Sequence, residues 1–104
     1  MKRYAVEALA LLSNLIKSRR IEGQMTMNEL AFRAGISTDI LERIEQADSA
    51  CPIGFYFAVA EELRIHLFED GQTRLTWRLF NVQEKIALLP KVDIQMRTQV
   101  KNDF

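Results

Sequence analysis

Apolar residues recur every three or four positions along most of this chain, which is the spacing of an amphipathic helix. The first such run predicts a helix between about residues 4 and 20. Its apolar face is expected to consist of Leu9, Leu12 and Ile16, widened by Ala8, Leu11 and Leu15. No run alternates at a period of two until near the C-terminus. The pattern therefore predicts an all-α protein.

Capping chemistry marks two short helices between residues 26 and 46. Thr26 followed three residues later by Glu29 is a capping box, in which each side chain accepts a hydrogen bond from the backbone N–H of the other residue. Gly35 suits the left-handed backbone that often ends a helix. Ser37 is a favourable N-cap for the second helix.

We expect the first of these helices over about 27–34 and the second over about 38–46. Their predicted inward faces consist of Leu30, Ala31, Ala34, Ile36, Leu41 and Ile44. Ala31 is small enough to let the two helices cross closely. Two short helices joined by a glycine turn are typical of a helix-turn-helix, whose second helix lies in the major groove of DNA. Any small helical domain also contains such pieces, so the turn alone is weak evidence.

A further helix is predicted from Pro52, because the missing N–H of proline costs little at the first position of a helix. Its apolar residues are Ile53, Phe57, Val59, Ala60 and Leu63. A short turn over 65–68 is expected to lay two more apolar side chains on the core. Asp70-Gly71 then breaks the chain, which predicts a first domain over residues 1–70.

Residues 71–90 carry a second informative pattern, in which apolar residues follow one another in steps of four, three, four and three up to Pro90. The residues of this seam are Leu75, Leu79, Val82, Ile86 and Leu89. A stripe of about two heptads is too short for an independent coiled coil and needs a partner surface. It could pack on its own domain, or it could form the contact of a homodimer, which we favour. We expect residues 91–104 to form an extended or disordered tail.

The charges of the chain cancel overall but are unevenly spread. Residues 1–70 contain 8 Lys and Arg against 11 Asp and Glu, a balance of −3, whereas residues 71–104 contain 6 against 3, a balance of +3. DNA-binding surfaces are usually basic, because neutralising phosphates supplies much of the affinity. The acidic balance therefore argues against tight DNA binding by this protein alone.

Several functional classes are excluded by what the sequence lacks. Cys51 is the only cysteine, which agrees with a reducing compartment, and we expect it to be a small apolar residue near a helix start and not a reactive thiol. His66 is the only histidine, and no spacing resembles a metal site. No glycine-rich phosphate loop or nucleophile–base pair is present, so we expect no enzyme, no catalytic residue and no cofactor. Without an apolar run of eighteen residues or a signal peptide, the expected location is the cytoplasm, with no membrane contact.

A basic pair, the capping box, the glycine turn and the end of the second helix form a recognisable set. These segments are Arg19-Arg20, Met25-Thr26, Glu29-Leu30-Ala31, Ala34-Gly35-Ile36-Ser37 and Arg43-Ile44-Glu45. With them, the chain resembles the cro/C1 type of helix-turn-helix domain, also called the XRE family, over about residues 9–69. The resemblance implies a five-helix domain followed here by an additional C-terminal helix, and a transcriptional regulator that binds double-stranded DNA. A symmetric dimer would match an operator with two half-sites about 34 Å apart.

A narrower resemblance covers nearly the whole chain. The run IGFYFAVAEELRIHLFE, a helix ending KIALLP and a tail closing in Asp-Phe are similar to HipB-like antitoxins. Those antitoxins are encoded beside HipA-like kinase toxins. This resemblance implies the antitoxin of a type II toxin–antitoxin pair, which represses its own promoter on the bacterial nucleoid and neutralises a kinase toxin.

The cro/C1 resemblance also implies which residues read DNA. Thr38 and Asp39 open the second helix of the motif and Glu42 follows one turn later, so these three would face base edges. The carboxylates could accept hydrogen bonds from cytosine N4, but they would also lie near phosphates. Many relatives have Gln at the position of Met27, and Asn28 could supply the missing hydrogen bond.

Basic residues are the other candidates for DNA contact. Arg33 and Arg43 would contact phosphates or bases, although Arg43 could instead pair with Glu29 or Glu45 and join the two helices. The full predicted DNA-binding set is Asn28, Arg33, Ser37, Thr38, Asp39, Glu42 and Arg43, with flanking phosphate contacts from Lys17, Arg19 and Arg20.

Two other functions stay open at this point. A protein-interaction module that kept the fold and lost DNA reading would fit Met27, Asp39, Glu42 and the acidic balance. A phage-type repressor without a toxin would share the DNA chemistry and lack the kinase partner. Four aromatic residues could form a partner-binding patch or fill the core, namely Phe55, Tyr56, Trp77 and Phe80.

Overall fold

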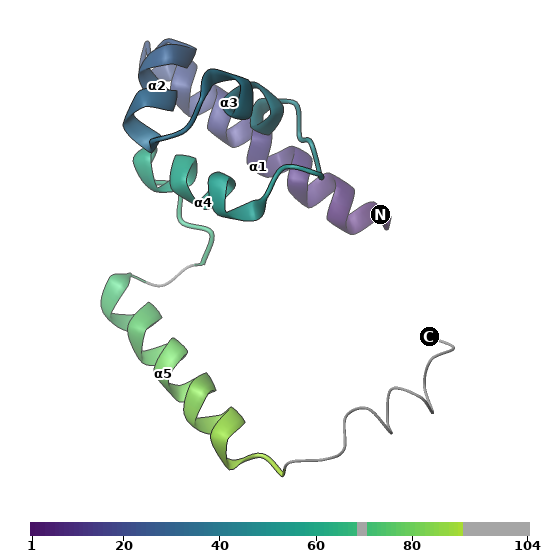
Figure 1. Cartoon of the computed structure of the whole chain (residues 1–104), viewed down its shortest axis with the longest axis vertical. Coiled ribbons are helices and arrows are strands. Elements are labelled where there is room, and N and C mark those ends of the chain that lie inside the picture. The colour runs from purple at the N-terminus through teal and green to yellow at the C-terminus, as the bar shows by residue number, and fades with distance from the viewer. Residues whose placement is uncertain (69–70, 91–104) are drawn as a thin grey trace. The chain divides into compact units, whose positions relative to one another are not determined.

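The computed structural model describes residues 1–68 and 71–90, which form five helices and no strand. The helices are α1 (Arg3–Glu22), α2 (Met27–Ala34), α3 (Thr38–Glu45), α4 (Ile53–Glu62) and α5 (Gln72–Leu88) (Figure 1). The prediction of an all-α protein is confirmed for these residues. The chain divides into two units, Met1–Glu69 and Asp70–Phe104. The predicted tail over 91–104 lies outside the described residues.

In the first unit, α2, α3 and α4 gather around the C-terminal half of α1, while the N-terminal half of α1 extends past them (Figure 1). The core consists of Ile16, Leu30, Ala31, Leu41, Ile44, Cys51, Tyr56, Val59 and Leu63, with Ala34 and Ile36 packed against it. The predicted inward faces of α2 and α3 are therefore confirmed. Cys51, just before α4, is buried in the same core.

The predicted apolar face of α1 is wrong in part. Leu9, Leu12 and Ile16 pack in or against the core, whereas Leu11 and Leu15 are exposed. At about 100° per residue, Leu15 lies about 100° and Leu11 about 140° around the helix from Ile16, which turns both away from the core. One helix therefore carries two apolar faces, and only one of them meets the core.

The end of the first unit also differs from the prediction. Residues 65–68 contain no helix and bend only at 67–68, so the unit has four helices among its described residues. Ile65 packs against the core, but Leu67 and Phe68 are exposed. Pro52 is the N-cap of α4, with an extended ψ of 136°, and α4 itself begins one residue later than predicted.

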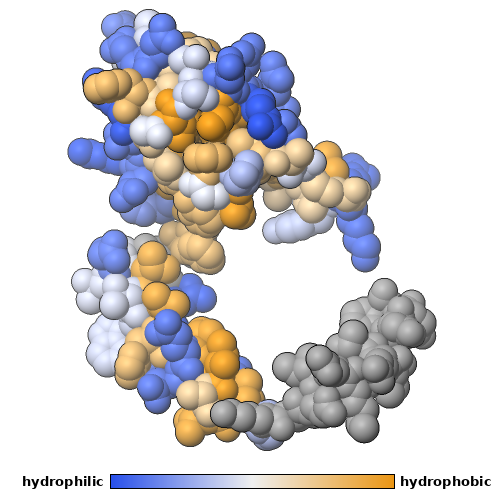
Figure 2. Space-filling model, in the orientation of Figure 1, coloured by the Kyte–Doolittle hydropathy of each residue, from blue (hydrophilic) through white to orange (hydrophobic). Residues whose placement is uncertain are grey.

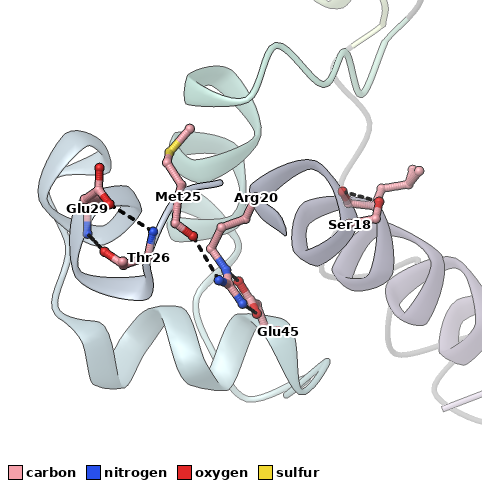
Figure 3. Close-up of polar contacts among 7 residues, drawn as sticks. Ser18, Arg20, Met25, Thr26, Glu29 and Glu45 are labelled. Carbon is pink, nitrogen blue, oxygen red and sulfur yellow. Dashed lines mark hydrogen bonds and ion pairs between the residues drawn. The ribbon is translucent and has the colours of Figure 1, made fainter. Parts of the chain in front are cut away.

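Local hydrogen bonds define the ends of α2 and α3 as the sequence predicts. The Glu29 N–H donates to Thr26 Oγ1 at 3.0 Å, and the Thr26 N–H donates to Glu29 Oε1 at 3.2 Å (Figure 3). Gly35 ends α2 with a φ of 72°. The Ile40 N–H donates to Ser37 Oγ at 3.1 Å, which caps α3.

A bidentate ion pair joins α1 to the end of α3. Arg20 Nε donates to Glu45 Oε2 at 2.7 Å, and Arg20 Nη2 donates to Glu45 Oε1 at 3.0 Å (Figure 3). Arg20 Nη1 also donates to the carbonyl oxygen of Met25, just before α2, at 3.1 Å. The two side chains are only 14% and 7% exposed. One arginine thus fixes the relative positions of α1, α3 and the chain entering α2.

Helix α5 makes up most of the described part of the second unit. It has 17 residues, begins after Gly71 without a side-chain cap and buries no residue. Apolar side chains lie at the surface along it (Figure 2). The rings of Trp77 and Phe80 meet edge to face, with centroids 5.9 Å apart. None of the helices in the described part of the chain is both long and apolar enough to cross a membrane.

The buried ion pair predicts a large loss of stability when one partner is removed. Replacing Glu45 by Ala leaves the Arg20 charge unpaired in a nearly buried position and should lower the free energy of unfolding by about 3–5 kcal/mol. Urea unfolding followed by circular dichroism measures this loss. Arg3→Ala is the matched control, because it removes an exposed ion pair with Glu7 and should cost about 0.5 kcal/mol or less. Equal effects of the two substitutions would contradict the structural role of Arg20.

Three non-glycine residues end or follow helices in the left-handed region, namely Gln24, Ala47 and Arg64. A side chain disfavours that backbone, so Ala47→Gly, at a φ of 59°, should stabilise the protein by about 0.5–1 kcal/mol. In contrast, Ala5→Gly, in the exposed part of α1, should destabilise it by about the same amount. Thermal unfolding of both variants measures the difference, and a destabilised Ala47→Gly would refute the argument.

Candidate nucleic-acid interface

Helix α3 presents an outward face that the rest of the first unit leaves accessible. Leu41 and Ile44 are fully buried on its inner side. On the other side, Asp39, Glu42 and Arg43 are exposed, and Thr38 is half-buried. The predicted reading positions at the start of α3 therefore lie together on one helix, at the surface.

A short turn over 35–37 positions α3 against α2. The Gly35 N–H donates to the Phe32 carbonyl at 3.2 Å, and the Ile36 N–H donates to the Ala31 carbonyl at 3.0 Å. Both bonds satisfy carbonyl groups at the end of α2, which is why the chain can reverse there without unpaired backbone groups. Ala31 is buried at the packing of the two helices, as its small side chain suggests. The direction of α3 is thus set by backbone hydrogen bonds and by close packing.

The exposed charges on α3 itself are mostly negative. Asp39 and Glu42 are exposed, and the hydroxyl of Ser37 caps the helix. A base pair facing this surface would meet two carboxylates and the Thr38 hydroxyl. Carboxylates accept hydrogen bonds from the cytosine amine, whereas they repel phosphates. The chemistry favours selective contact over tight contact.

Arg43 belongs to a different ion pair from the one that the sequence suggested. Its Nε donates to Asp48 Oδ2 at 2.8 Å, so the expected pairs with Glu29 and Glu45 are wrong. The physical reason is that Glu29 completes the capping box and Glu45 is held by Arg20. The Arg43 side chain keeps 45% of its surface exposed.

Asp48 organises the loop between α3 and α4. Its Oδ1 accepts a hydrogen bond from the Ala50 N–H at 2.8 Å, and its carbonyl oxygen accepts one from the Tyr56 hydroxyl at 2.9 Å. The Arg43 guanidinium, helped by the Ala50 N–H, lowers the pKa of the Asp48 carboxyl, and the same pairing raises the pKa of Arg43. Burial raises the pKa of the Tyr56 hydroxyl.

The three predicted phosphate contacts have different positions. Arg20 is held in the buried ion pair with Glu45, which leaves it inside the fold and contradicts its predicted contact with phosphate. Arg19 is exposed but donates through Nη1 to the Leu63 carbonyl at 3.0 Å, which ties α1 to the end of α4. Lys17 is exposed on α1.

Helix α2 contributes two of the predicted residues and one that sequence reasoning missed. Asn28 and Arg33 are exposed. Phe32 lies beside Arg33 and is 87% exposed. The sequence did contain a signal that Phe32 is exposed, because Phe32 is not among the residues, such as Leu30 and Ala31, that form the predicted inward face of α2. Met27 is half-buried and packs against the core.

The aromatic and seam residues are divided between core and surface. Tyr56 is buried and Phe55 packs against the core. Trp77 and Phe80 are exposed on α5. The five predicted seam residues also lie on α5 or at its end, and all are exposed.

The pKa of Asp48 predicts a specific acid dependence of stability. A carboxyl whose pKa is lowered in the folded state stabilises the fold above its usual pKa of 3.8, and this contribution is lost as the pH falls through the folded value. The Asp48→Asn variant should therefore lose less of its free energy of unfolding as the pH falls from 5 to the lowest pH at which the protein is still folded. Urea midpoints measured across that range test this, and Arg43→Gln should reduce the same slope. An unchanged slope in both variants would contradict the assignment.

The structure describes no cluster of three His, Cys, Asp or Glu residues that could hold a metal ion within residues 1–68 and 71–90. Comparison with protein families, with curated proteins and with solved structures finds no match to this chain.

Proposed function

We propose that this protein is a dimeric DNA-binding transcriptional regulator of the cro/C1 helix-turn-helix type. The observation that carries the proposal is the pairing of α2 and α3, two helices of eight residues joined by a short glycine-containing turn, with the outer face of α3 exposed. In such a motif the first residues of the second helix contact base edges in the major groove. Thr38, Asp39 and Glu42 hold those positions.

Residues around α3 would supply the contacts to the DNA backbone. Arg33 and Asn28 are exposed on α2, and Lys17 is exposed on α1. Arg43 is half exposed and could contact a phosphate while it pairs with Asp48. Such contacts position a protein on the duplex, whereas the base contacts specify sequence. Few cations and two exposed carboxylates predict weak DNA binding by a single reading head, that is, by the helix-turn-helix of one chain.

The resemblance to HipB-like antitoxins supplies a way to overcome weak binding. We include in the proposal that the protein represses its own promoter and neutralises a HipA-like kinase toxin. A complex that presents two or four reading heads gains affinity through effective concentration without any new contact. DNA binding is then weak for the protein alone and stronger with its partner. A phage-type repressor would bind the same kind of operator without a kinase, and the neighbouring reading frame distinguishes the two.

A second candidate function is a protein-interaction module that does not read DNA. The observation that favours it is the surface of α2 and α3, where Phe32 is 87% exposed, Asp39 and Glu42 are exposed, and Arg20 is withdrawn into the fold. Exposed aromatic side chains are common anchors in protein interfaces. The two candidates differ in one measurable property, which is the dependence of binding on duplex sequence and salt.

The first test is fluorescence anisotropy of labelled DNA from upstream of the reading frame, titrated with protein at two salt concentrations. A scrambled duplex is the control. The proposal predicts saturable binding that prefers the native sequence and weakens as salt rises. Equal or absent binding on both duplexes, alone and with the kinase partner, would instead favour the interaction module.

Neutralising variants on α3 make the test specific to the reading face. Asp39→Asn with Glu42→Gln should raise affinity for the scrambled duplex, because two charges that repel phosphate are removed, and should lower the preference for the native sequence. Glu61→Gln with Glu62→Gln is the matched control, since it makes the same change in charge at exposed positions of α4. Arg33→Ala should weaken binding to both duplexes and reduce the salt slope by about one. The same response from both double variants would indicate an effect of net charge alone.

A further inference from the structure

Helix α1 carries an apolar stripe that no part of the first unit covers. The stripe consists of Tyr4, Ala8, Leu11 and Leu15, all exposed, with Tyr4 and Leu11 at 85% and 61%. At about 100° per residue these four side chains lie within a sector of about 60°, opposite the buried Ser13 and about 80–140° around the helix from the buried Ile16. Figure 1 shows that the N-terminal half of α1, which carries most of this stripe, extends beyond α3 and α4.

The stripe on α1 has the same spacing as the seam on α5. Its four residues follow one another in steps of four, three and four, as do Leu75, Leu79, Val82 and Ile86. This order reads the same in both directions, so two such helices also match when they run antiparallel. The antiparallel layers are Tyr4 with Ile86, Ala8 with Val82, Leu11 with Leu79, and Leu15 with Leu75.

We propose that α5 of a second copy of this chain packs antiparallel on the exposed stripe of α1, and that the contact is reciprocal. A two-fold axis then relates two identical α1·α5 pairs, as in the isologous contacts of most dimers. Each pair has knobs from alternating positions facing holes on the partner helix. The inference rests on the proposed dimer and not on the proposed reading of DNA.

The charges beside the two stripes are complementary in this arrangement. Glu7 immediately precedes Ala8, and Lys85 immediately precedes Ile86, so both lie on the same edge of the helix pair and meet across it. Positions flanking a helical seam often form ion pairs that set partner and orientation. Glu7 already pairs with Arg3 at 2.9 Å, but both side chains are more than half exposed, and such a pair rearranges at little cost.

A second copy fits these observations better through α1 than through α5 alone. An antiparallel pair of two α5 helices would leave Lys85 without the carboxylate that Glu7 of α1 offers. It would also leave the α1 stripe uncovered, and a single seam of about two heptads is short for a stable contact. The reciprocal arrangement covers both stripes and doubles the number of helix pairs.

Molar mass in solution, measured by light scattering after size exclusion, tests the arrangement without DNA. The full chain should have about twice its mass of 12.0 kDa. Leu11→Glu and Leu79→Lys, each alone, should give monomers with unchanged helical circular dichroism, since both side chains are exposed within one chain. The double variant should regain the dimer, because the introduced Glu and Lys face each other. Val6→Glu and Leu88→Lys are matched controls on other faces of the same helices and should stay dimeric.

Several results would overturn the proposal. A wild-type monomer would do so, because the stripes would then be unpaired or paired within one chain. A dimer that survives Leu11→Glu and is lost with Leu79→Lys would indicate contact between two α5 helices. Failure of the double variant to recover the dimer would show that Leu11 and Leu79 do not face each other. None of these molar-mass measurements depends on DNA binding, so a failed DNA titration would not change the conclusion about the dimer.

Discussion

The ion pair between Arg20 and Glu45 connects residues 25 positions apart and sets the frame on which the candidate interface is built. Arg20 leaves the last turn of α1 and binds both the carboxylate at the end of α3 and the carbonyl before α2. Breaking that contact would loosen the C-terminal end of α3 from α1, although Leu41 and Ile44 would still hold the helix in the core. The pair is costly to desolvate and therefore tolerates little error in geometry. The orientation of the exposed face of α3 follows from this buried contact together with the packing of its inner face.

The same contact changes the electrostatics of the surface. Arg20 pairs inside the first unit and Arg43 is partly neutralised by Asp48, so two of its cations contribute little to a field around α3. Asp39 and Glu42 have no such burial. A basic reading face is the usual device for DNA affinity. Here cations stabilise the fold, which makes a cooperating partner or a second reading head a natural requirement of any DNA function.

Local features of this fold were predictable and distant ones were not. The capping box at Thr26 and Glu29, the Ser37 cap and the turn at Gly35 involve residues within three positions of each other, so composition and spacing suffice. The partners of Arg20 and Arg43 depend on which of several carboxylates the fold brings close. Leu9 and Leu11 look alike in sequence, yet only the packing of α3 decides which one is covered. The short turn predicted over 65–68 places Ile65 against the core, whereas Leu67 and Phe68 are exposed, and spacing alone does not distinguish them.

Cys51 has a consequence that lies outside binding altogether. It is the only thiol in the chain, and 5% of its surface is exposed, among Tyr56, Val59 and the other core residues. An alkylating reagent reacts with the thiolate and needs access to it. The rate at which Cys51 is alkylated therefore reports how often the core opens at this residue, without an introduced label. The native sequence of the first unit therefore already contains a reactive group whose modification rate measures local opening of the core.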